Sequence, residues 1–345
     1  MIQTICISNN CEWDSIVKSF AEYDVYYLSG YVKAFQIHGD GEPQLLYYEA
    51  IGLKAIYVYM KRKTDIEGVY DSITPYGYGG VLFEGNTCES NLQAFWKEYT
   101  EKMAEECIID NFVRYHPILM NAIPMKSLSE VIDLGKTVAF DLTSPDVIWK
   151  NIISKNRNVI RKAQKNGIEI KHGKGMELLH KFMEIYNVTM EKDNAEEYYY
   201  FKEAFYESIN RDLQDNYEVF YAEYEGKKIA ISIIIFANKQ MHYHLSGSMI
   251  EYRSLAPSNL LLYKTALWGC EQGYKTFHLG GGIGSGEDNL YKFKAAFNRK
   301  SDCLFSIGKQ IFNKEKYDDL VSLRIANDPG FNIKSTFFPL YKNKI

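Results

Sequence analysis

Residues 219–237 read VFYAEYEGKKIAISIIIFA, and this stretch decides the fold. Aromatic and β-branched residues run on both sides of Gly226, which is typical of two strands joined by a tight turn. The same figure occurs earlier, where LLYYEA precedes Ile51 and Gly52 and LKAIYVYM follows them. Placing Gly52 on Gly226 also matches Tyr47 with Tyr221, Glu49 with Glu223, and Lys54 with Lys228. The two hairpins therefore predict an internal duplication.

The segments after each hairpin follow one order. Strand candidates lead into glycine at 70–80 and 241–247, helices open on Ser-Asn-Leu at 90–92 and 258–260, and further strands follow at 108–115 and 276–279. Such alternation predicts a mixed α/β fold with three layers, α/β/α. We expect two tandem domains, residues 1–143 and 144–317, with the tail 318–345 packing back on the first domain and the active site in the second.

The second half opens with a helix. Ser144 can cap it, Pro145 suits its first position, and Gly167 stops it after Asn166. Apolar residues recur between these signals at helical spacing, so we expect one helix over 145–165. Further helices are expected over 176–192, 258–272 and 289–298, with a strand over 304–312.

Composition narrows the class of protein. Lys and Arg total 40 against 44 Asp and Glu, so the net charge of −4 gives no global attraction to nucleic acid or anionic membrane. The six cysteines show no spacing suited to zinc, and no apolar run approaches the ~20 residues of a membrane helix. We expect a cytoplasmic protein with free thiols, no metal and no membrane insertion. The sequence does not indicate an oligomeric state.

The loop 280–286, GGGIGSG, invites a nucleotide-binding interpretation that its residues exclude. It contains no G-K-[ST], and every attempt at G-x-G-x-x-G fails. Glycine still lets a substrate approach the backbone. We expect Gly281 and Gly282 to contact substrate, with a purely structural turn as the alternative.

Several segments resemble the GCN5-related N-acetyltransferase (GNAT) superfamily, and within it the FemABX-type, BioF2-like branch with two tandem domains. Asn156 with the helix residues 157–167 resembles the motif N-x-R-x-x-x-R-K-A-x-K-N-G, with a slightly different start. Other matching segments are Tyr186 with Thr189 and Met190, Leu255 to Leu260, Gly273 to Gly282, Phe293-Lys294 with Phe297, and residues 74–80 and 113–117 of the first half. The chain is similar to shorter members that lack an inserted coiled coil.

The resemblance implies an acyltransferase with Lys294 at its centre. Acyl transfer to an amine builds negative charge on the carbonyl oxygen and on the leaving group, and a fixed ammonium can stabilise either. The matching lysine of the family is implicated in catalysis, and Phe293 precedes it in the F-K-x-x-F run. A solvated lysine on a surface helix is the alternative for Lys294.

Three cations, Arg157, Arg161 and Lys165, recur every fourth residue along one helix face. Phosphates of coenzyme A, of a nucleotide-linked acceptor or of tRNA are possible ligands, and an ordinary charged outer face explains them equally well. Arg253 and the helix opening at Ser258 and Asn259 stand where the superfamily binds pyrophosphate. The usual signature is absent there, so we expect Ser258 simply to cap the helix.

His242 and His244 are two residues apart on a predicted strand, and His244 is a candidate base. A packed strand histidine is the alternative. In the first half, Tyr76 and Tyr78 are candidates for contacts with the acceptor between the domains, or simply part of a glycine-tyrosine turn.

Three functions follow from these patterns. The first is direct transfer of an acyl group from acyl-CoA to an amine of a cell-envelope, amino-sugar or peptide acceptor, without a covalent enzyme intermediate. The second is a peptidyltransferase that takes its group from aminoacyl-tRNA and adds it to a nucleotide-linked precursor of peptidoglycan. The third is a binding module that retains the fold without catalysis.

Overall fold

The structure is a computed structural model that describes residues 2–50 and 52–343. It divides into two compact units. Unit 1 contains residues 1–134 and 305–345, and unit 2 contains residues 135–304. The predicted division into independent domains, with boundaries at 143/144 and 317/318, stays a prediction.

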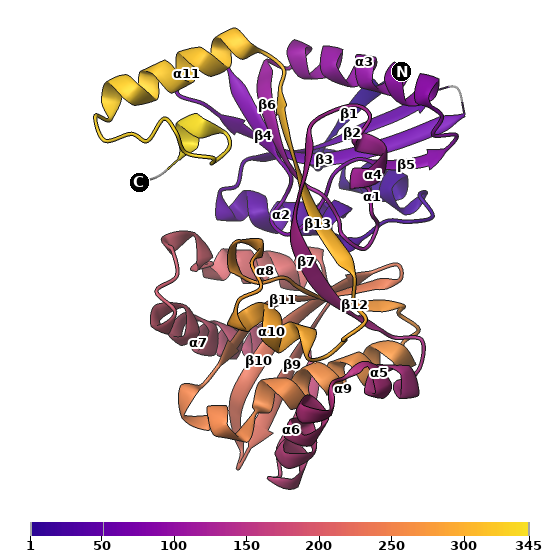
Figure 1. Ribbon diagram of the computed structural model, residues 1–345, viewed down its shortest axis with the longest axis vertical. Coiled ribbons are helices and arrows are strands. Elements are labelled where there is room, and N and C mark those ends of the chain that lie inside the picture. The colour runs from indigo at the N-terminus through magenta and orange to yellow at the C-terminus, as the bar shows by residue number, and fades with distance from the viewer. Residues whose placement is uncertain (1, 51, 344–345) are drawn as a thin grey trace. The chain divides into compact units, whose positions relative to one another are not determined.

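Unit 2 is built on a six-stranded mixed sheet (Figure 1). Its order is β7-β12-β11-β10-β9-β8, in which β11 and β12 are parallel and the other neighbours antiparallel. The strands are β7 (Val131–Asp141, from residue 135 in this unit), β8 (Glu169–Gly173), β9 (Tyr217–Tyr224), β10 (Lys227–Ala237), β11 (Gln240–Ser248) and β12 (Thr276–Gly280). Its helices are α5 (Pro145–Asn151), α6 (Ser154–Lys165), α7 (Met176–Lys192), α8 (Glu203–Asp212), α9 (Pro257–Glu271) and α10 (Asn289–Ala295).

Both faces of this sheet are covered, as the continuous apolar run of β10 requires. Ala230, Ile234 and Phe236 belong to a core that also contains buried residues of α5, α6 and α9. The alternate residues Ile231 and Ile233 are equally buried but lie outside that core. Helix α7 packs on β10 and β11. Unit 2 is therefore a three-layer α/β/α structure, as predicted.

Unit 1 repeats the sheet. Its order is β1-β2-β3-β4-β6-β13, with β5 paired to β3, and β4 and β6 are the parallel pair. The strands are β1 (Ile2–Cys6), β2 (Glu42–Ala50), β3 (Leu53–Lys63), β4 (Tyr70–Ile73), β5 (Leu82–Gly85), β6 (Ile108–Arg114) and β13 (Cys303–Ile311, from residue 305 in this unit). Its helices are α1 (Asn10–Lys18), α2 (Ser29–His38), α3 (Glu89–Glu105), α4 (Ala122–Met125) and α11 (Lys314–Asn327).

The two sheets match strand for strand in order and direction, from β1 and β8 through to β13 and β7. In each, a hairpin is followed by a strand, a helix and a parallel strand, as the repeat at Gly52 and Gly226 predicted. Gly226 has a φ of 75°, a left-handed conformation that glycine adopts readily. The predicted tandem α/β fold is thus confirmed.

The helix predicted over 145–165 is wrong in one respect, because it is two helices. Ser144 does cap α5, its side chain accepting a hydrogen bond from the amide of Val147. Ile152 and Ile153 then adopt extended conformations before α6 begins. The amide of Ile153 donates to the carbonyl oxygen of Ala296 at 3.1 Å, so a tertiary hydrogen bond replaces a helical one.

The C-terminal segment packs within unit 1. Tyr317 and Tyr341 share a small apolar core with Ile109. The Tyr341 hydroxyl lies 3.0 Å from a carboxylate oxygen of Asp71 and 2.7 Å from one of Asp110. Among the helices in the described part of the chain, none is long and apolar enough to cross a membrane.

Candidate active site in unit 2

The parallel strands β11 and β12 pair over only three positions. Residues 240–242 pair with residues 276–278, and the register then ends, although β11 continues to residue 248 and β12 to residue 280. We call residues 243–248 and 279–280 the strand fork. Backbone groups on the inner edges of the fork are not committed to each other in the described register, so they can bind an extended ligand.

The corresponding strands of unit 1 stay joined. Beyond their last registered pair, the amide of Thr74 donates to Phe112 at 3.1 Å and that of Gly79 donates to Arg114 at 2.8 Å. Gly79 and Tyr115 then form a further parallel bridge. Backbone hydrogen bonds therefore close in unit 1 the position that is forked in unit 2.

A β-bulge lies in the fork. Two consecutive residues of β10 pair with Tyr243 and Leu245, which leaves His244 as the extra residue. Bulges are over-represented beside active sites, and this one interrupts the strand alternation that would otherwise place the side chains of His242 and His244 on the same face of the sheet. Burial, followed by the nearby His242, lowers the pKa of His244 to about 3. The imidazole is then neutral at pH 7 and takes up a proton poorly, which weakens the case for His244 as a base.

Helix α9 begins directly after the fork and a short 3₁₀ segment that contains the exposed Arg253. The prediction that Ser258 caps this helix is wrong. Ala256 is the N-cap, with a φ of 56°, Pro257 is the first helical residue, and no described side chain caps the helix. Ser258 lies inside the first turn. The helix start therefore offers its amides and the positive end of its dipole to an anion.

Asn156 ties the start of α9 to α6 and α10. Its side-chain oxygen accepts a hydrogen bond from the amide group of Asn259 at 2.8 Å. Its own amide group donates to the carbonyl oxygen of Ala296 at 3.4 Å. Asn156 is buried, so these bonds fix the first turn of α9 relative to the helix that carries Lys294.

Lys294 is a buried cation, not a solvated surface lysine. The residue is 8% exposed, and its ammonium donates to the carbonyl oxygen of Gly281, one residue beyond β12, at 2.7 Å. Burial lowers the pKa of Lys294 to about 8, while Asp288 acts in the opposite direction. At pH 7 the ammonium form still prevails by about ten to one, in surroundings that disfavour the charge. An electropositive group thus stands at the end of the fork.

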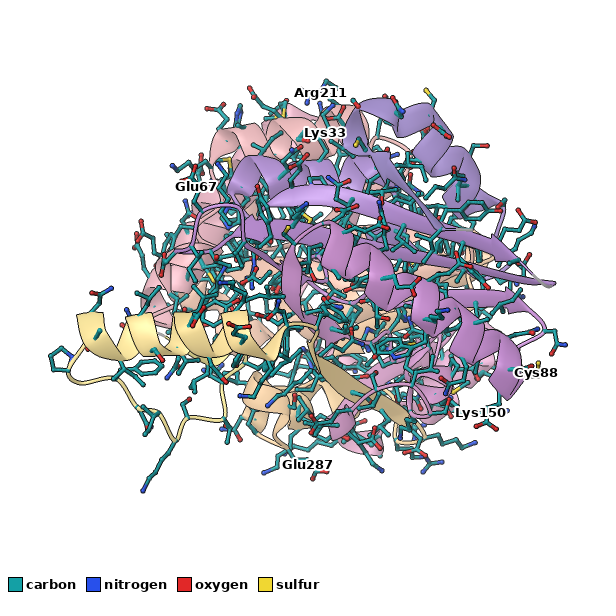
Figure 2. The ribbon with its side chains drawn as sticks, turned by 90° about the horizontal axis from the view of Figure 1, so that it is seen from above. Lys33, Glu67, Cys88, Lys150, Arg211 and Glu287 are labelled. Atoms are coloured by element: carbon teal, nitrogen blue, oxygen red, sulfur yellow. The ribbon has the colours of Figure 1, made fainter. Side chains whose placement is uncertain are left out.

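The glycine loop is packed against its own unit. A Cβ on Gly282 would collide with the carbonyl of Gly286 and the carboxylate of Asp288, and one on Gly281 would lie 3.1 Å from the backbone of Lys136. Asp288 caps α10 through the amide of Tyr291 and also accepts from the amide of Ile283. The neighbouring Glu287 points outward at the periphery (Figure 2). These contacts give Gly281 and Gly282 a structural role, and their predicted substrate contact stays a prediction.

The remaining candidates of unit 2 lie on helices around this site. Phe293 packs edge-on against the buried Phe297, with ring centroids 5.4 Å apart. Arg157 and Arg161 both approach the indole of Trp149 from α6. Lys165, the third cation of that predicted face, is exposed one turn further on.

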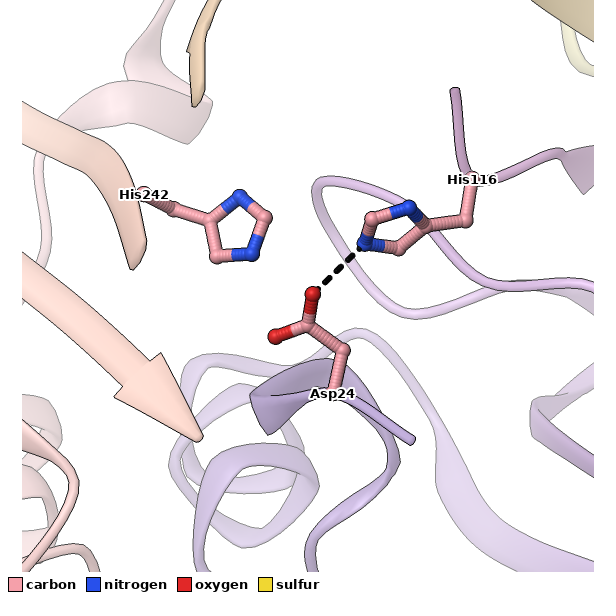
Figure 3. Close-up of side chains that lie close together, drawn as sticks. All are labelled: Asp24, His116 and His242. Carbon is pink, nitrogen blue, oxygen red and sulfur yellow. Dashed lines mark hydrogen bonds and ion pairs between the residues drawn. The ribbon is translucent and has the colours of Figure 1, made fainter. Parts of the chain in front are cut away.

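Tyr76 and Tyr78 belong to unit 1. The ring of Tyr76 stacks on Phe35 at a centroid distance of 5.3 Å. The ring of Tyr78 lies 5.8 Å from His116, whose imidazole is hydrogen-bonded to the buried Asp24 at 2.8 Å (Figure 3). Both tyrosines are therefore part of an aromatic cluster, and a role with the acceptor stays a prediction.

Sequence reasoning missed three contributors: the tie made by Asn156, the cap made by Asp288, and Trp149. Asp288 was detectable in principle, because an aspartate directly before a predicted helix is a common cap. The contacts of Asn156 and Trp149 depend on segments far apart in the sequence.

Comparison with known proteins agrees with this geometry. Residues 154–294 match the family model described as an acetyltransferase (GNAT) domain. This match begins with α6 and ends at Lys294, so it contains the fork, the start of α9 and the glycine loop. No curated protein sequence matches the chain significantly.

Solved structures match over nearly the whole chain. FemX is 15% identical, covers 92% of this chain and 99% of its own length, and has a TM-score of 0.70. The C-terminal domain of a protein assigned as a lysylphosphatidylglycerol synthetase from Agrobacterium fabrum is 15% identical. The match covers 93% of this chain and 96% of that domain, with a TM-score of 0.59. A tandem GNAT protein from the clavulanic acid biosynthesis pathway is 7% identical. The match covers 91% of this chain and 99% of that protein, with a TM-score of 0.51.

At these identities the likeness shows the fold. The matches confirm the predicted GNAT-type, FemABX-like architecture and support the predicted acyltransferase. Residues 154–294 match the model of a GNAT acetyltransferase domain, and the chain as a whole is similar in fold to FemX.

Proposed function

We propose that the protein transfers an acyl group from acyl-CoA to an amine, and that unit 2 binds the donor. One observation carries the proposal. The fork between β11 and β12, the uncapped start of α9 and the buried ammonium of Lys294 are joined into one site by Asn156 and Gly281. In unit 1 backbone hydrogen bonds close the equivalent fork.

Each part of the donor has a matching feature in this site. The pantetheine arm is extended and contains two amides, which suit the backbone edges of the fork, where the register between β11 and β12 has ended. The pyrophosphate is a dianion, which suits the first-turn amides of Ser258 and Asn259 and the dipole of α9. Arg253, just before the helix, can add a charge-assisted hydrogen bond.

The chemistry then follows from the charge on Lys294. The acceptor nitrogen attacks the thioester carbonyl, a C–N bond forms, and the C–S bond breaks with its electron pair on sulfur. Negative charge develops first on the carbonyl oxygen and then on the thiolate. The ammonium of Lys294 can stabilise either charge, and a pKa of about 8 also lets it pass a proton to the thiolate near neutral pH. The amine's proton leaves to a base that we do not assign.

The acceptor belongs to the same proposal. From the family resemblance we propose an amine on a cell-envelope precursor, amino sugar or peptide, acted on in the cytoplasm, with Tyr76 and Tyr78 among its contacts. We propose direct transfer without a metal, because an amine can attack a thioester without metal activation.

A ligand panel tests the donor. Coenzyme A at a hundredfold excess over its Kd should raise the stability of the folded protein by about 2.7 kcal/mol, which a thermal shift detects. Charged tRNA and UDP-linked acceptors form the other arms. A shift with charged tRNA and none with coenzyme A would contradict the acyl-CoA assignment.

Aminoacyl-tRNA is the second candidate donor. One observation favours it: α6 carries Lys155, Arg157, Arg161, Lys162 and Lys165 and no acidic residue, a charge pattern that suits RNA phosphates. The similar Agrobacterium protein is also named for an aminoacylated product.

A binding module without catalysis is the third candidate. Absence of turnover with any donor, together with retained binding, would favour it. The buried ammonium of Lys294 argues for catalysis, because a charge held in unfavourable surroundings is typical of functional sites.

A further inference from the structure

Two arginines of α6 place their guanidinium groups around the indole of Trp149, which lies near the end of α5. The guanidinium of Arg161 lies 5.0 Å from the ring centroid of Trp149, and that of Arg157 lies 6.0 Å from it. The indole itself packs against Tyr263 of α9, with centroids 5.1 Å apart. Two like charges therefore share one aromatic support.

Both arginines are oriented without being neutralised. Arg157 donates to the carbonyl oxygen of Trp149 at 3.3 Å, and Arg161 donates to the side-chain oxygen of Asn158 at 3.1 Å. Within residues 2–50 and 52–343, no carboxylate forms an ion pair with either guanidinium. Each group has five N–H donors, so most of them stay available.

An uncompensated pair of this kind is suited to an anion beside a flat ring. Guanidinium groups bind phosphate with two parallel hydrogen bonds, and their planar faces also stack on aromatic bases. The cation–π contact with Trp149 holds the Arg161 guanidinium 5.0 Å from the ring centroid, so less conformational freedom is lost on binding. Arg161 is exposed, which leaves its outer face open to a base.

The pair also stands next to the proposed pyrophosphate site. Asn156, which precedes Arg157, accepts a hydrogen bond from Asn259 in the first turn of α9. Tyr263, against which Trp149 packs, lies one turn further along the same helix, about 5.4 Å in rise. A ligand whose pyrophosphate binds the start of α9 can reach the arginines with its nucleoside end.

We propose that Trp149, Arg157 and Arg161 form a subsite for the adenosine 3′-phosphate end of coenzyme A. The two guanidiniums bind the 3′-phosphate, and the plane of Arg161, supported by Trp149, stacks on the adenine. This subsite rests on the proposed acyl-CoA donor. It makes α5 and α6, which lie between β7 and β8 in the chain, part of donor recognition.

The experiment compares coenzyme A with 3′-dephospho-coenzyme A by calorimetric titration. Wild-type protein should bind coenzyme A about ten- to a hundredfold more tightly. Arg161→Gln should reduce that ratio to within about threefold of unity while leaving the affinity for 3′-dephospho-coenzyme A almost unchanged. Lys165→Gln is the matched control, because it removes one exposed charge from the same helix away from Trp149 and should keep the wild-type ratio.

Other outcomes overturn the subsite or its basis, and they are distinguishable. Equal wild-type affinity for the two coenzymes would refute the subsite and leave the acyl-CoA donor intact, as would an unchanged ratio in Arg161→Gln. Absence of binding by either coenzyme would refute the donor and the subsite together. If Lys165→Gln also lost the preference for coenzyme A over 3′-dephospho-coenzyme A, the preference would come from the general positive charge of α6, and the subsite would be refuted. The arginines would instead be assigned to RNA binding by two results together. The wild type would not distinguish coenzyme A from 3′-dephospho-coenzyme A, and Arg161→Gln would bind a charged tRNA acceptor stem more weakly than the wild type does.

Discussion

Replacing Lys294 by methionine separates the stability of this protein from its proposed chemistry. Burial lowers the pKa of the side chain from its ordinary 10.5 to about 8. Each pKa unit corresponds to about 1.4 kcal/mol, so the buried ammonium lowers the free energy of unfolding by about 3 kcal/mol at pH 7. Methionine removes the destabilisation caused by the buried ammonium. It also removes the hydrogen bond to Gly281, and loss of that bond lowers the free energy of unfolding by about 1–3 kcal/mol. At pH 7 the variant should therefore be about as stable as the wild type.

The sign of the pH dependence follows from linkage. Between pH 8 and 10.5 the unfolded chain holds a proton on Lys294 that the folded protein has lost, so the free energy of unfolding rises with pH. The wild type should gain about 3 kcal/mol over this window that Lys294→Met does not gain. Urea denaturation of both proteins at pH 7 and pH 10 measures the difference, in which the other lysines cancel. Lys292→Met, an exposed change on the same helix, should follow the wild type.

Activity gives the second readout for this variant. Loss of a group that stabilises developing negative charge lowers kcat by about 10²–10³. Lys294→Met should show this loss while staying folded, and Lys292→Met should not. Identical pH dependence of stability in wild type and Lys294→Met would refute the buried ammonium. Unchanged kcat in a folded Lys294→Met would refute its role in the reaction.

Three further substitutions test individual contacts. Asn156→Ala should lower the free energy of unfolding by about 1–3 kcal/mol, because it removes the hydrogen bond from Asn259 at the start of α9. The same change should raise the KM for the donor more than it lowers kcat. Equal effects on KM and kcat would contradict a positioning role. Gly282→Ala should lower the melting temperature, because its Cβ meets the carboxylate that caps α10; a melting temperature at or above that of the wild type would show that the loop relaxes freely. Ser144→Ala should lower stability by about 1 kcal/mol in urea denaturation, since it removes the cap of α5, and no change would mean that solvent replaces the cap.

The hairpins and their order were predictable because local chemistry specifies them. Runs of aromatic and β-branched residues meet at Gly226, and that glycine adopts the left-handed conformation the turn needs. Recurrence of the pattern at Gly52 is visible in the residues alone, and it indicates the duplication. The cap by Ser144 is local in the same sense.

The break between α5 and α6 was not predictable from local signals. Neither proline nor glycine marks it, and the apolar spacing continues through Ile152. The helix ends there because the amide of Ile153 finds a partner in Ala296, far along the chain. Likewise, the F-K-x-x-F context suggested Lys294, but only the fold shows that its ammonium is buried against Gly281. The cap assigned to Ser258 failed because Pro257 starts the helix one residue earlier, with Ala256 before it.

Hydrogen exchange in the presence and absence of coenzyme A tests the central claim most directly. If unit 2 binds the donor at the fork, coenzyme A should slow exchange at residues 243–248, at the first turn of α9 and at residues 279–282. Residues 74–80, at the closed equivalent position of unit 1, should exchange at the same rate with and without ligand. Protection at 74–80 without protection at the fork, or no protection in either unit at saturating coenzyme A, would contradict the account.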